Sequence, residues 1–431
     1  MTAEICVANR RALVLAADSA ATVAHSHQED GAKERYYKGA NKIFHFSDVE
    51  PVGVMIYDSA AIHTVPWETV IKDCRRQRGK HAFKSMDDYA KDLFQFVETK
   101  LGHIFTEKMR RDDFIVLVMK QYFQLVRLMN SEPAVKAASD LASLQKALAD
   151  LVGARLPVMR SAELPEGITA EHVSKALSDF QPGLVSDFGG IPYAHPSGER
   201  TLADILPHGA NDFWELVIRV TFQRYASLAP MTGVVMAGFG EDEYFPSYVH
   251  YGCYGFLNDR LVVRKITADV KIDGDNTSKV EAFAQTEMAE TFMVGMSPEM
   301  LNFVTEATND CLATATNELV SAGATLPPGW TDRLAELQAE HRKKWVQKAI
   351  ERHWHPLSRV VGSLPLEDMA TLAETMVALT SLKERVTRGT ETVGGAIDVA
   401  VLTRGDGFVW VKRKHYFDPN LNPRYFARLR S

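Results

Sequence analysis

The first hundred residues change from strand-like to helix-like patterning. Residues 3–8 and 12–17 are nearly continuous apolar runs separated by Asn9-Arg10-Arg11, and this pattern predicts two short β-strands joined by a tight turn. Two more strands are predicted at 42–46 and 53–57. The next elements have helical spacing of apolar residues and are predicted as helices, one over 65–76 and one beginning at the N-cap Ser85.

Mainly helical spacing continues from 105 to 229, and we interpret these residues as an insertion or subdomain. Strands return at 233–239, 247–252 and 261–266, because apolar runs are again bounded by turn residues. The remaining predicted elements are helices at 298–321, 332–353 and 365–386 and strands at 397–403 and 407–412.

The register of the first hairpin makes a prediction about two polar residues. If the turn is symmetric about Arg10, one continuous apolar face forms from the pairs Ala3–Ala17, Ile5–Leu15 and Val7–Leu13. Thr2 then lies opposite Asp18, with Cβ atoms about 4.5–5.5 Å apart. The hairpin is therefore expected to bring a hydroxyl and a carboxylate together.

Composition narrows the class of protein. The 431 residues are 46% hydrophobic and 24% charged, as in globular proteins, and the net charge of −6 favours neither a nucleic acid nor an anionic membrane as partner. The four cysteines are isolated from one another, so no disulfide framework or zinc knuckle is indicated. The apolar run 12–17 is shorter than the about 7–15 residues of a secretory signal core. We therefore expect a cytoplasmic protein without a membrane span.

Thr2 is a candidate nucleophile. Methionine aminopeptidases remove Met1 when the next side chain is small, and threonine qualifies. The exposed α-amine, with a pKa of about 7.7–8.0, can accept the proton of the adjacent hydroxyl. Lys42 near the threonine would favour deprotonation of that hydroxyl, and Asp18 would orient the lysine. The alternative is an ordinary N-terminal threonine beside a surface ion pair of little consequence.

Several short motifs in order resemble those of proteasome β subunits and the related bacterial HslV and Anbu peptidases. After Thr2 come LVLAADSAAT at 13–22, KIF at 42–44 and GVM at 53–55. Near the C-terminus, GGAIDV at 394–399 and TRGDGF at 403–408 are similar to the last strand pair of that family. The resemblance covers about half of the chain.

The resemblance implies an α+β protein with the four-layer αββα sandwich of N-terminal nucleophile (Ntn) hydrolases and a mainly helical insertion. It divides the chain into two parts of the sandwich, 2–104 and 230–322, the helical insertion 105–229, a helical insertion or linker 323–364, and a final part, 365–431. The final part contains the last helix, the C-terminal strands and a basic tail. The resemblance also implies a homo-oligomer, since relatives form rings, although the sequence identifies neither a symmetry nor an ATP-dependent unfoldase partner.

The resemblance assigns roles to particular residues. Thr2 takes the position of the nucleophile, Lys42 that of the activating lysine and Asp18 that of the acid that holds it. The oxyanion would be stabilised by the backbone N–H of Tyr57, where Tyr57-Asp58 replaces the family's Gly-Gly.

The supporting residues depart from the family pattern. The family's Gly-Ser-Gly loop falls at Ala284-Gln285-Thr286, so that Gln285 or Thr286 would replace its serine. The acid and serine that orient the N-terminal amine fall near Glu391 and Thr392, with Val393 in the serine position.

The leading hypothesis is a threonine peptidase that hydrolyses amide bonds in peptides or proteins without a cofactor or a metal. Two alternatives remain: an Ntn amidase that acts on a small molecule, and a catalytically silent scaffold that binds partner proteins. The basic tail offers a contact for an acidic partner or RNA, but a tail packed on the fold is the simpler interpretation, and no nucleic acid is expected.

Overall fold

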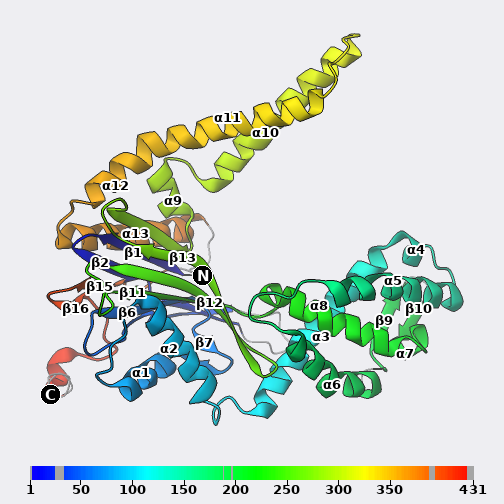
Figure 1. Cartoon of the computed structure of the whole chain (residues 1–431), viewed down its shortest axis with the longest axis horizontal. Coiled ribbons are helices and arrows are strands. Elements are labelled where there is room, and N and C mark those ends of the chain that lie inside the picture. The colour runs from blue at the N-terminus through cyan, green and yellow to red at the C-terminus, as the bar shows by residue number, and fades with distance from the viewer. Residues whose placement is uncertain (1, 25–33, 188, 196–197, 388–393, 425–431) are drawn as a thin grey trace.

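The computed structural model describes residues 2–24, 34–187, 189–195, 198–387 and 394–424. In this part of the chain, two five-stranded sheets contain antiparallel pairs only, and helices surround them (Figure 1). The first sheet has the order β14 (Ser278–Ala284), β1 (Ala3–Asn9), β2 (Ala12–Ala17), β15 (Asp398–Thr403) and β16 (Gly407–Lys412). The second has the order β13 (Arg260–Lys271), β12 (Ser247–Leu257), β11 (Thr232–Gly238), β6 (Val52–Asp58) and β5 (Ile43–His45).

Asn9 shapes the turn between β1 and β2. Its Oδ1 accepts hydrogen bonds from the N–H of Arg11 at 2.9 Å and of Ala12 at 3.3 Å, which closes a two-residue loop of Arg10 and Arg11. The strands consequently pair Glu4 with Ala17, so the register expected from a turn centred on Arg10 is wrong by one residue.

Both faces of β1 are buried, not one. Ile5 and Val7 pack in a cluster with the helices outside the first sheet, whereas Cys6 and Ala8 lie in a cluster shared with the second sheet. Thr2 and Glu4 are in phase with Cys6, because alternate residues of a strand point to the same face. A polar pair therefore sits at the start of a buried strand.

Helices cover the two sheets. Helix α13 (Leu366–Thr387) packs on β1, β2 and β15, and helix α2 (Met86–Thr99) packs on β11, β12 and β13. Helix α1 (Trp67–Arg78) lies beside α2 and, as its spacing predicts, buries Trp67, Val70, Ile71 and Cys74. The Ser85 hydroxyl accepts a hydrogen bond from the N–H of Asp88, which confirms the predicted N-cap of α2. The chain is a mixed α/β protein with antiparallel sheets, which agrees with the α+β class expected from the sequence.

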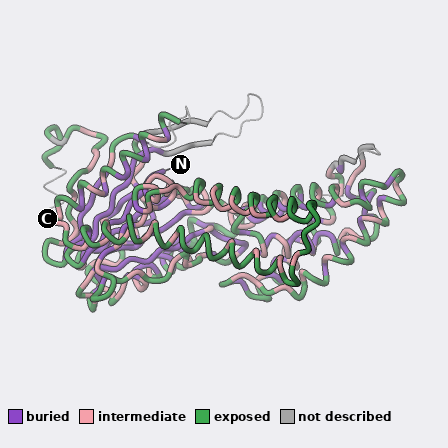
Figure 2. The backbone as a smooth tube through the Cα atoms, turned by 90° about the horizontal axis from the view of Figure 1, so that it is seen from above, coloured by how far each residue is buried: buried purple, intermediate pink, exposed green. Residues whose placement is uncertain are grey.

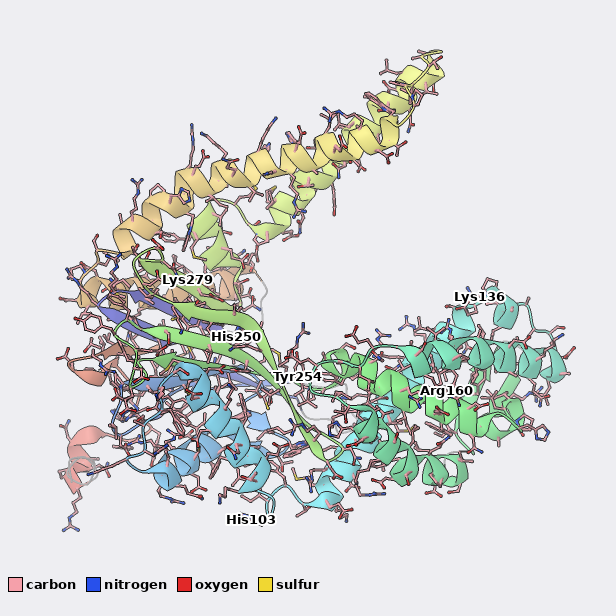
Figure 3. The ribbon with its side chains drawn as sticks, viewed as in Figure 1. His103, Lys136, Arg160, His250, Tyr254 and Lys279 are labelled. Carbon is pink, nitrogen blue, oxygen red and sulfur yellow. The ribbon has the colours of Figure 1, made fainter. Side chains whose placement is uncertain are left out.

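The residues between the second helix and β11 form a helical region with its own core. Helix α8 (Ala210–Leu228) packs against α3 (Glu107–Ser131), α5 (Leu141–Ser161) and α6 (Ala170–Asp187). Phe114, Trp214 and Phe222 are fully buried among these helices. Figure 3 places Lys136 and Arg160 in this region, away from Lys279 and His250 on the strands. The region also contains the short elements α4 (Pro133–Lys136), β9 (Pro192–His195), β10 (Gly198–Thr201) and α7 (Leu202–Ile205).

A long helical hairpin projects from the side of the two sheets on which α13 lies (Figure 1). Helix α10 (Pro298–Ser321) has the predicted bounds and is followed by α11 (Trp330–Ala349). Neither helix contains a buried residue, and both are largely exposed in Figure 2. A π-helical turn (Ile350–Trp354) and α12 (His355–Val361) lead back to the first sheet.

Some elements were not predicted from the sequence. They are β14, β9 and β10, the hairpin of β3 (Ala20–Ala24) and β4 (Glu34–Lys38), the short pair β7 (Ala61–Ile62) and β8 (Val65–Pro66), and helix α9 (Glu287–Val294). In β14, Lys279 and Glu281 interrupt the apolar pattern, and Glu281 is accommodated by a hydrogen bond from Tyr248 of the other sheet. Such a contact across sheets cannot be read from the local sequence.

We expect Asn9→Ala to lower the free energy of unfolding by about 2–4 kcal/mol. The substitution removes the two acceptor contacts of the turn and also the donation from Nδ2 to the carbonyls of Val361 at 3.0 Å and Leu364 at 3.1 Å. Urea unfolding measures the change. In the control Arg10→Ala, an exposed side chain loses bonds to the carbonyls of Asp273 and Gly274, and a loss below about 1 kcal/mol is expected. Equal losses for the two variants would contradict this role for Asn9.

Candidate active site

Asp18 is buried at the end of β2 and is surrounded by hydrogen-bond donors. Its Oδ1 accepts from the N–H of Ala3 at 3.1 Å, and its Oδ2 accepts from the N–H of Ala20 at 3.3 Å and of Gly394 at 2.8 Å. The Asp18 N–H in turn donates to the carbonyl of Ala3 at 3.1 Å. The carboxylate thus joins the start of β1 to the segment that enters β15.

Lys42 reaches this carboxylate from the second sheet. Its ammonium donates to Asp18 Oδ1 and lies 3.4 Å from Oε1 of Glu4. The backbone of Lys42 is held by a 2.9 Å hydrogen bond from the N–H of Ile56 to its carbonyl. Lys42 and Asp18 are both buried, so the predicted pair is not the surface ion pair that was its alternative.

Thr2 lies at the edge of the same group. Its hydroxyl donates to Oε2 of Glu4 at 3.1 Å, and its carbonyl accepts from the N–H of Gln285 at 3.1 Å. Thr2 is 5% exposed. The one-residue correction of the hairpin register aligns Asp18 with Ala3, so the expected position of Asp18 directly opposite Thr2 is wrong. The carboxylate of Asp18 nevertheless anchors the peptide N–H that follows Thr2.

Glu4 was not predicted as a site residue. It connects the Thr2 hydroxyl to the Lys42 ammonium and is 0% exposed. Burial raises the pKa of Glu4 to about 8, even though the charge of Lys42 acts in the opposite direction. The signal in the sequence was a lone charged residue in an apolar strand, two positions after Thr2 and therefore on the same face.

The pairing of β6 determines where its N–H groups point. The N–H of Ile56 donates to Lys42 on the β5 side, and the N–H of Ser59 donates to Met231 on the β11 side. Since N–H directions alternate along a strand, the N–H of Tyr57 points to its partner Gly233 on β11, and the N–H of Asp58 points to the side of Lys42. Asp58 has a positive φ of 62°.

The side chain of Tyr57 packs between the sheets. Its hydroxyl hydrogen-bonds to Nε2 of His250, a buried residue of β12 that is labelled in Figure 3 and that the sequence did not single out. Burial lowers the pKa of His250. The ring of Tyr57 stacks on Phe283 and fills the space beside Gly233, where a Cβ atom would lie 2.0 Å from the ring. This close approach explains why a glycine occupies position 233.

Of the supporting residues expected from the family resemblance, the structure describes Gln285 and Thr286. Gln285 contributes its backbone N–H to Thr2, and Thr286 is the residue before helix α9, where its side chain makes no capping hydrogen bond. Both side chains are half-buried. Glu391 and Thr392 lie outside the described residues.

The described residues contain neither a candidate metal site nor a candidate membrane span. No group of three or more His, Cys, Asp or Glu side chains is arranged to hold a metal ion in that part of the chain. None of the helices within the same residues has the length and apolar character needed to cross a membrane.

Comparisons with known proteins give little information on this site. No protein-family model and no curated protein matches the chain. The solved structure of an Anbu (Gly-1) mutant from Hyphomicrobium sp. strain MC1 is similar to the chain with a TM-score of 0.27 and 9% identity, over 100% of this chain and 95% of that chain. At this TM-score the likeness indicates at most a distant proteasome-like relation and carries no argument about activity.

The pKa of Glu4 predicts a loss of stability at alkaline pH. Because the pKa rises from 4.5 to about 8 on folding, the stabilisation by protonated Glu4 is complete below pH 4.5 and is lost as the pH rises through about 8. Thermal or urea unfolding of the wild type and of Glu4→Gln, from pH 4.5 to 9, measures this effect. We expect the wild type to lose up to about 4–5 kcal/mol relative to the variant. Parallel pH curves would exclude a raised pKa.

Proposed function

We propose that this chain is a threonine-type Ntn hydrolase of the proteasome-like kind, with Thr2 as its nucleophile after removal of Met1. In this proposal the two sheets and the helices on their outer sides form the four-layer αββα sandwich. The substrate is an amide bond, and no cofactor takes part.

The observation that carries the proposal is the convergence of Thr2, Asp18 and Lys42 from two sheets. Residues 40 positions apart in the chain meet in a buried cluster at the start of β1, and Asp18 contacts both the Lys42 ammonium and the peptide N–H that follows Thr2. A buried cation near a hydroxyl favours the deprotonated form of that hydroxyl. A surface ion pair would require neither this burial nor these backbone contacts.

The N–H direction in β6 supports Asp58, rather than Tyr57, as the backbone donor to the oxyanion. The Tyr57 N–H faces β11, whereas the Asp58 N–H faces the side of the strand on which Lys42 lies. The positive φ of Asp58 is a conformation that glycine adopts without strain, which agrees with the glycines of the resembling family at this place. Burial raises the pKa of the Asp58 carboxyl, and the charge of Lys42 partly offsets this effect.

We further propose a peptide or protein as the substrate and a homo-oligomer as the working form. The projecting hairpin and the separate helical region leave large surfaces for contacts between subunits or with a substrate-delivering partner. A small-molecule amidase uses the same site chemistry, so a comparison of peptide and small-amide libraries distinguishes the two substrates.

Intact-mass measurement and covalent labelling test the proposal. We expect the purified chain to lack Met1 and a β-lactone probe to acylate Thr2, because the α-amine and hydroxyl are then on one residue. Labelling of Thr2→Ala should fall by more than about 10³-fold. The matched control Ser59→Ala removes a hydroxyl on the loop after β6 that bonds to the carbonyl of Ala61, and it should label normally.

The same experiment identifies the alternatives. Retained Met1 together with no labelling of the wild type would favour the silent scaffold. Equal labelling of the wild type and Thr2→Ala would show that the probe reacts elsewhere and would contradict the assignment of Thr2.

A further inference from the structure

Glu4 is the buried carboxylate in direct contact with the Thr2 hydroxyl. Its Oε2 accepts this hydroxyl at 3.1 Å, and its Oε1 lies 3.4 Å from Nζ of Lys42. Neighbouring positions on the adjacent strands are apolar, since Glu4 pairs with Phe283 of β14 and Ala17 of β2. A charged residue at such a position loses hydration on folding and is destabilising unless its contacts compensate.

The charges around Glu4 are unbalanced. The titratable groups that face it are Asp18 from the end of β2, Lys42 from the start of β5 and the phenol of Tyr57 from β6. Burial raises the pKa of the phenol, which therefore remains neutral. The Lys42 ammonium is thus the one positive charge among these groups, and it contacts the two carboxylates of Asp18 and Glu4.

Lys42 contacts Asp18 more closely than it contacts Glu4. It receives three backbone N–H donors and the ammonium of Lys42, whereas Glu4 receives the Thr2 hydroxyl and the longer contact to Lys42. Hydrogen bonds to a carboxylate stabilise its ionised form. The ionised form of Glu4 therefore receives less stabilisation from hydrogen bonds, and Glu4 is the carboxylate of this pair that contacts the Thr2 hydroxyl.

We propose that Glu4 is a catalytic base that accepts the proton of the Thr2 hydroxyl. This inference rests on the proposed function, and it gives the site a side-chain proton acceptor in addition to the α-amine. The Glu4 carboxylate is already hydrogen-bonded to the atom that would attack, as a general base must be.

The proton and electron movements balance. When Thr2 Oγ bonds to the substrate carbonyl carbon, its proton passes to Oε2 of Glu4 and the carbonyl electrons move to the oxygen. When the carbonyl re-forms, the C–N bond breaks and the leaving amine takes the proton from Glu4. Water then attacks the ester, gives a proton to Glu4, and the departing Thr2 Oγ recovers it, which restores the starting state.

The location of Lys42 is suited to this cycle. Its charge favours the ionised form of Glu4, which is the form that accepts the proton and becomes the major form above about pH 8. Its contact with Asp18 keeps the ammonium in place when Glu4 becomes protonated and neutral. Lys42 therefore acts as a positioning residue for Glu4, and Asp18 acts as a positioning residue for Lys42.

The test is the rate at which a β-lactone acylates Thr2 of the full chain, measured by mass spectrometry from pH 6 to 9. We expect Glu4→Gln, which keeps the shape of the side chain, to slow labelling by about 10²–10⁴-fold, the usual contribution of a general base. The matched control Glu281→Gln alters a carboxylate on the adjacent strand that bonds to Tyr248 and not to Thr2, and it should label at the wild-type rate.

Chemical rescue separates a catalytic role from a structural one. In Glu4→Ala, added formate should restore part of the labelling rate by occupying the space of the lost carboxylate, whereas Thr2→Ala should remain unlabelled. If Glu4→Gln melts below the assay temperature, Glu4→Asp replaces it, and its shorter carboxylate should give an intermediate rate.

The outcomes distinguish the two proposals. A wild type that labels at Thr2, with Glu4→Gln labelling at the same rate over the whole pH range, overturns the role of Glu4 and leaves the threonine hydrolase intact. If Glu4→Asp labels at the wild-type rate and formate does not raise the rate of Glu4→Ala, the role of Glu4 as a base is likewise overturned and the threonine hydrolase remains. A wild type that does not label at Thr2 overturns both.

Discussion

The buried ion pair between Lys42 and Asp18 is the interaction on which the candidate site depends. Asp18 follows a strand of the first sheet, and Lys42 precedes a strand of the second, so the pair connects the two sheets at one end. Loss of one partner would leave an uncompensated buried charge, which typically costs about 3–5 kcal/mol. The three backbone N–H groups on Asp18 fix the direction of the carboxylate and thereby the location of the ammonium.

A second carboxylate, Glu4, joins this pair. A paired Asp and Lys alone would form a closed, neutral unit. Glu4 adds a group whose charge is not fully compensated, and it does so in contact with the hydroxyl of Thr2. Burial, which is unfavourable for the fold, is what moves the pKa of Glu4 to about 8, near the range that the proposed role as a base requires. In the proposed mechanism, the same burial that lowers the stability of the fold would make Glu4 a better proton acceptor.

The helical region of residues 107–228 and the hairpin of α10 and α11 are stabilised by different interactions. The helices between Glu107 and Leu228 bury Phe114, Trp214 and Phe222 in a cluster of their own, and packing stabilises them. The helices α10 and α11 bury no residue, so local helix propensity and the partial contacts between them must maintain the hairpin. The capping hydroxyl of Ser297, which accepts from the N–H of Met300 at 3.2 Å, contributes at its start.

The sequence by itself determined the parts that depend on local pattern. Apolar periodicity located α1, α10, α13 and most strands of the two sheets, and the N-cap Ser85 located the start of α2, because these signals lie within a few residues of the element they define. The order of Thr2, Asp18 and Lys42 identified the residues that meet in the site. Strand β14 was missed because polar residues interrupt its apolar pattern, and one of them, Glu281, has its hydrogen-bond partner Tyr248 on the other sheet.

The tertiary structure decided what depends on the exact placement of the chain. The side chain of Asn9 closed a two-residue loop and moved the hairpin register by one residue, and no pattern of apolar residues distinguishes these two turns when both faces of β1 are buried. The N–H directions of Tyr57 and Asp58 follow from pairing with β11 and β5, which the local sequence does not specify. The role of Glu4 required the distances to Thr2 and Lys42, since a pKa is set by burial and by neighbouring charges that only the folded chain brings together.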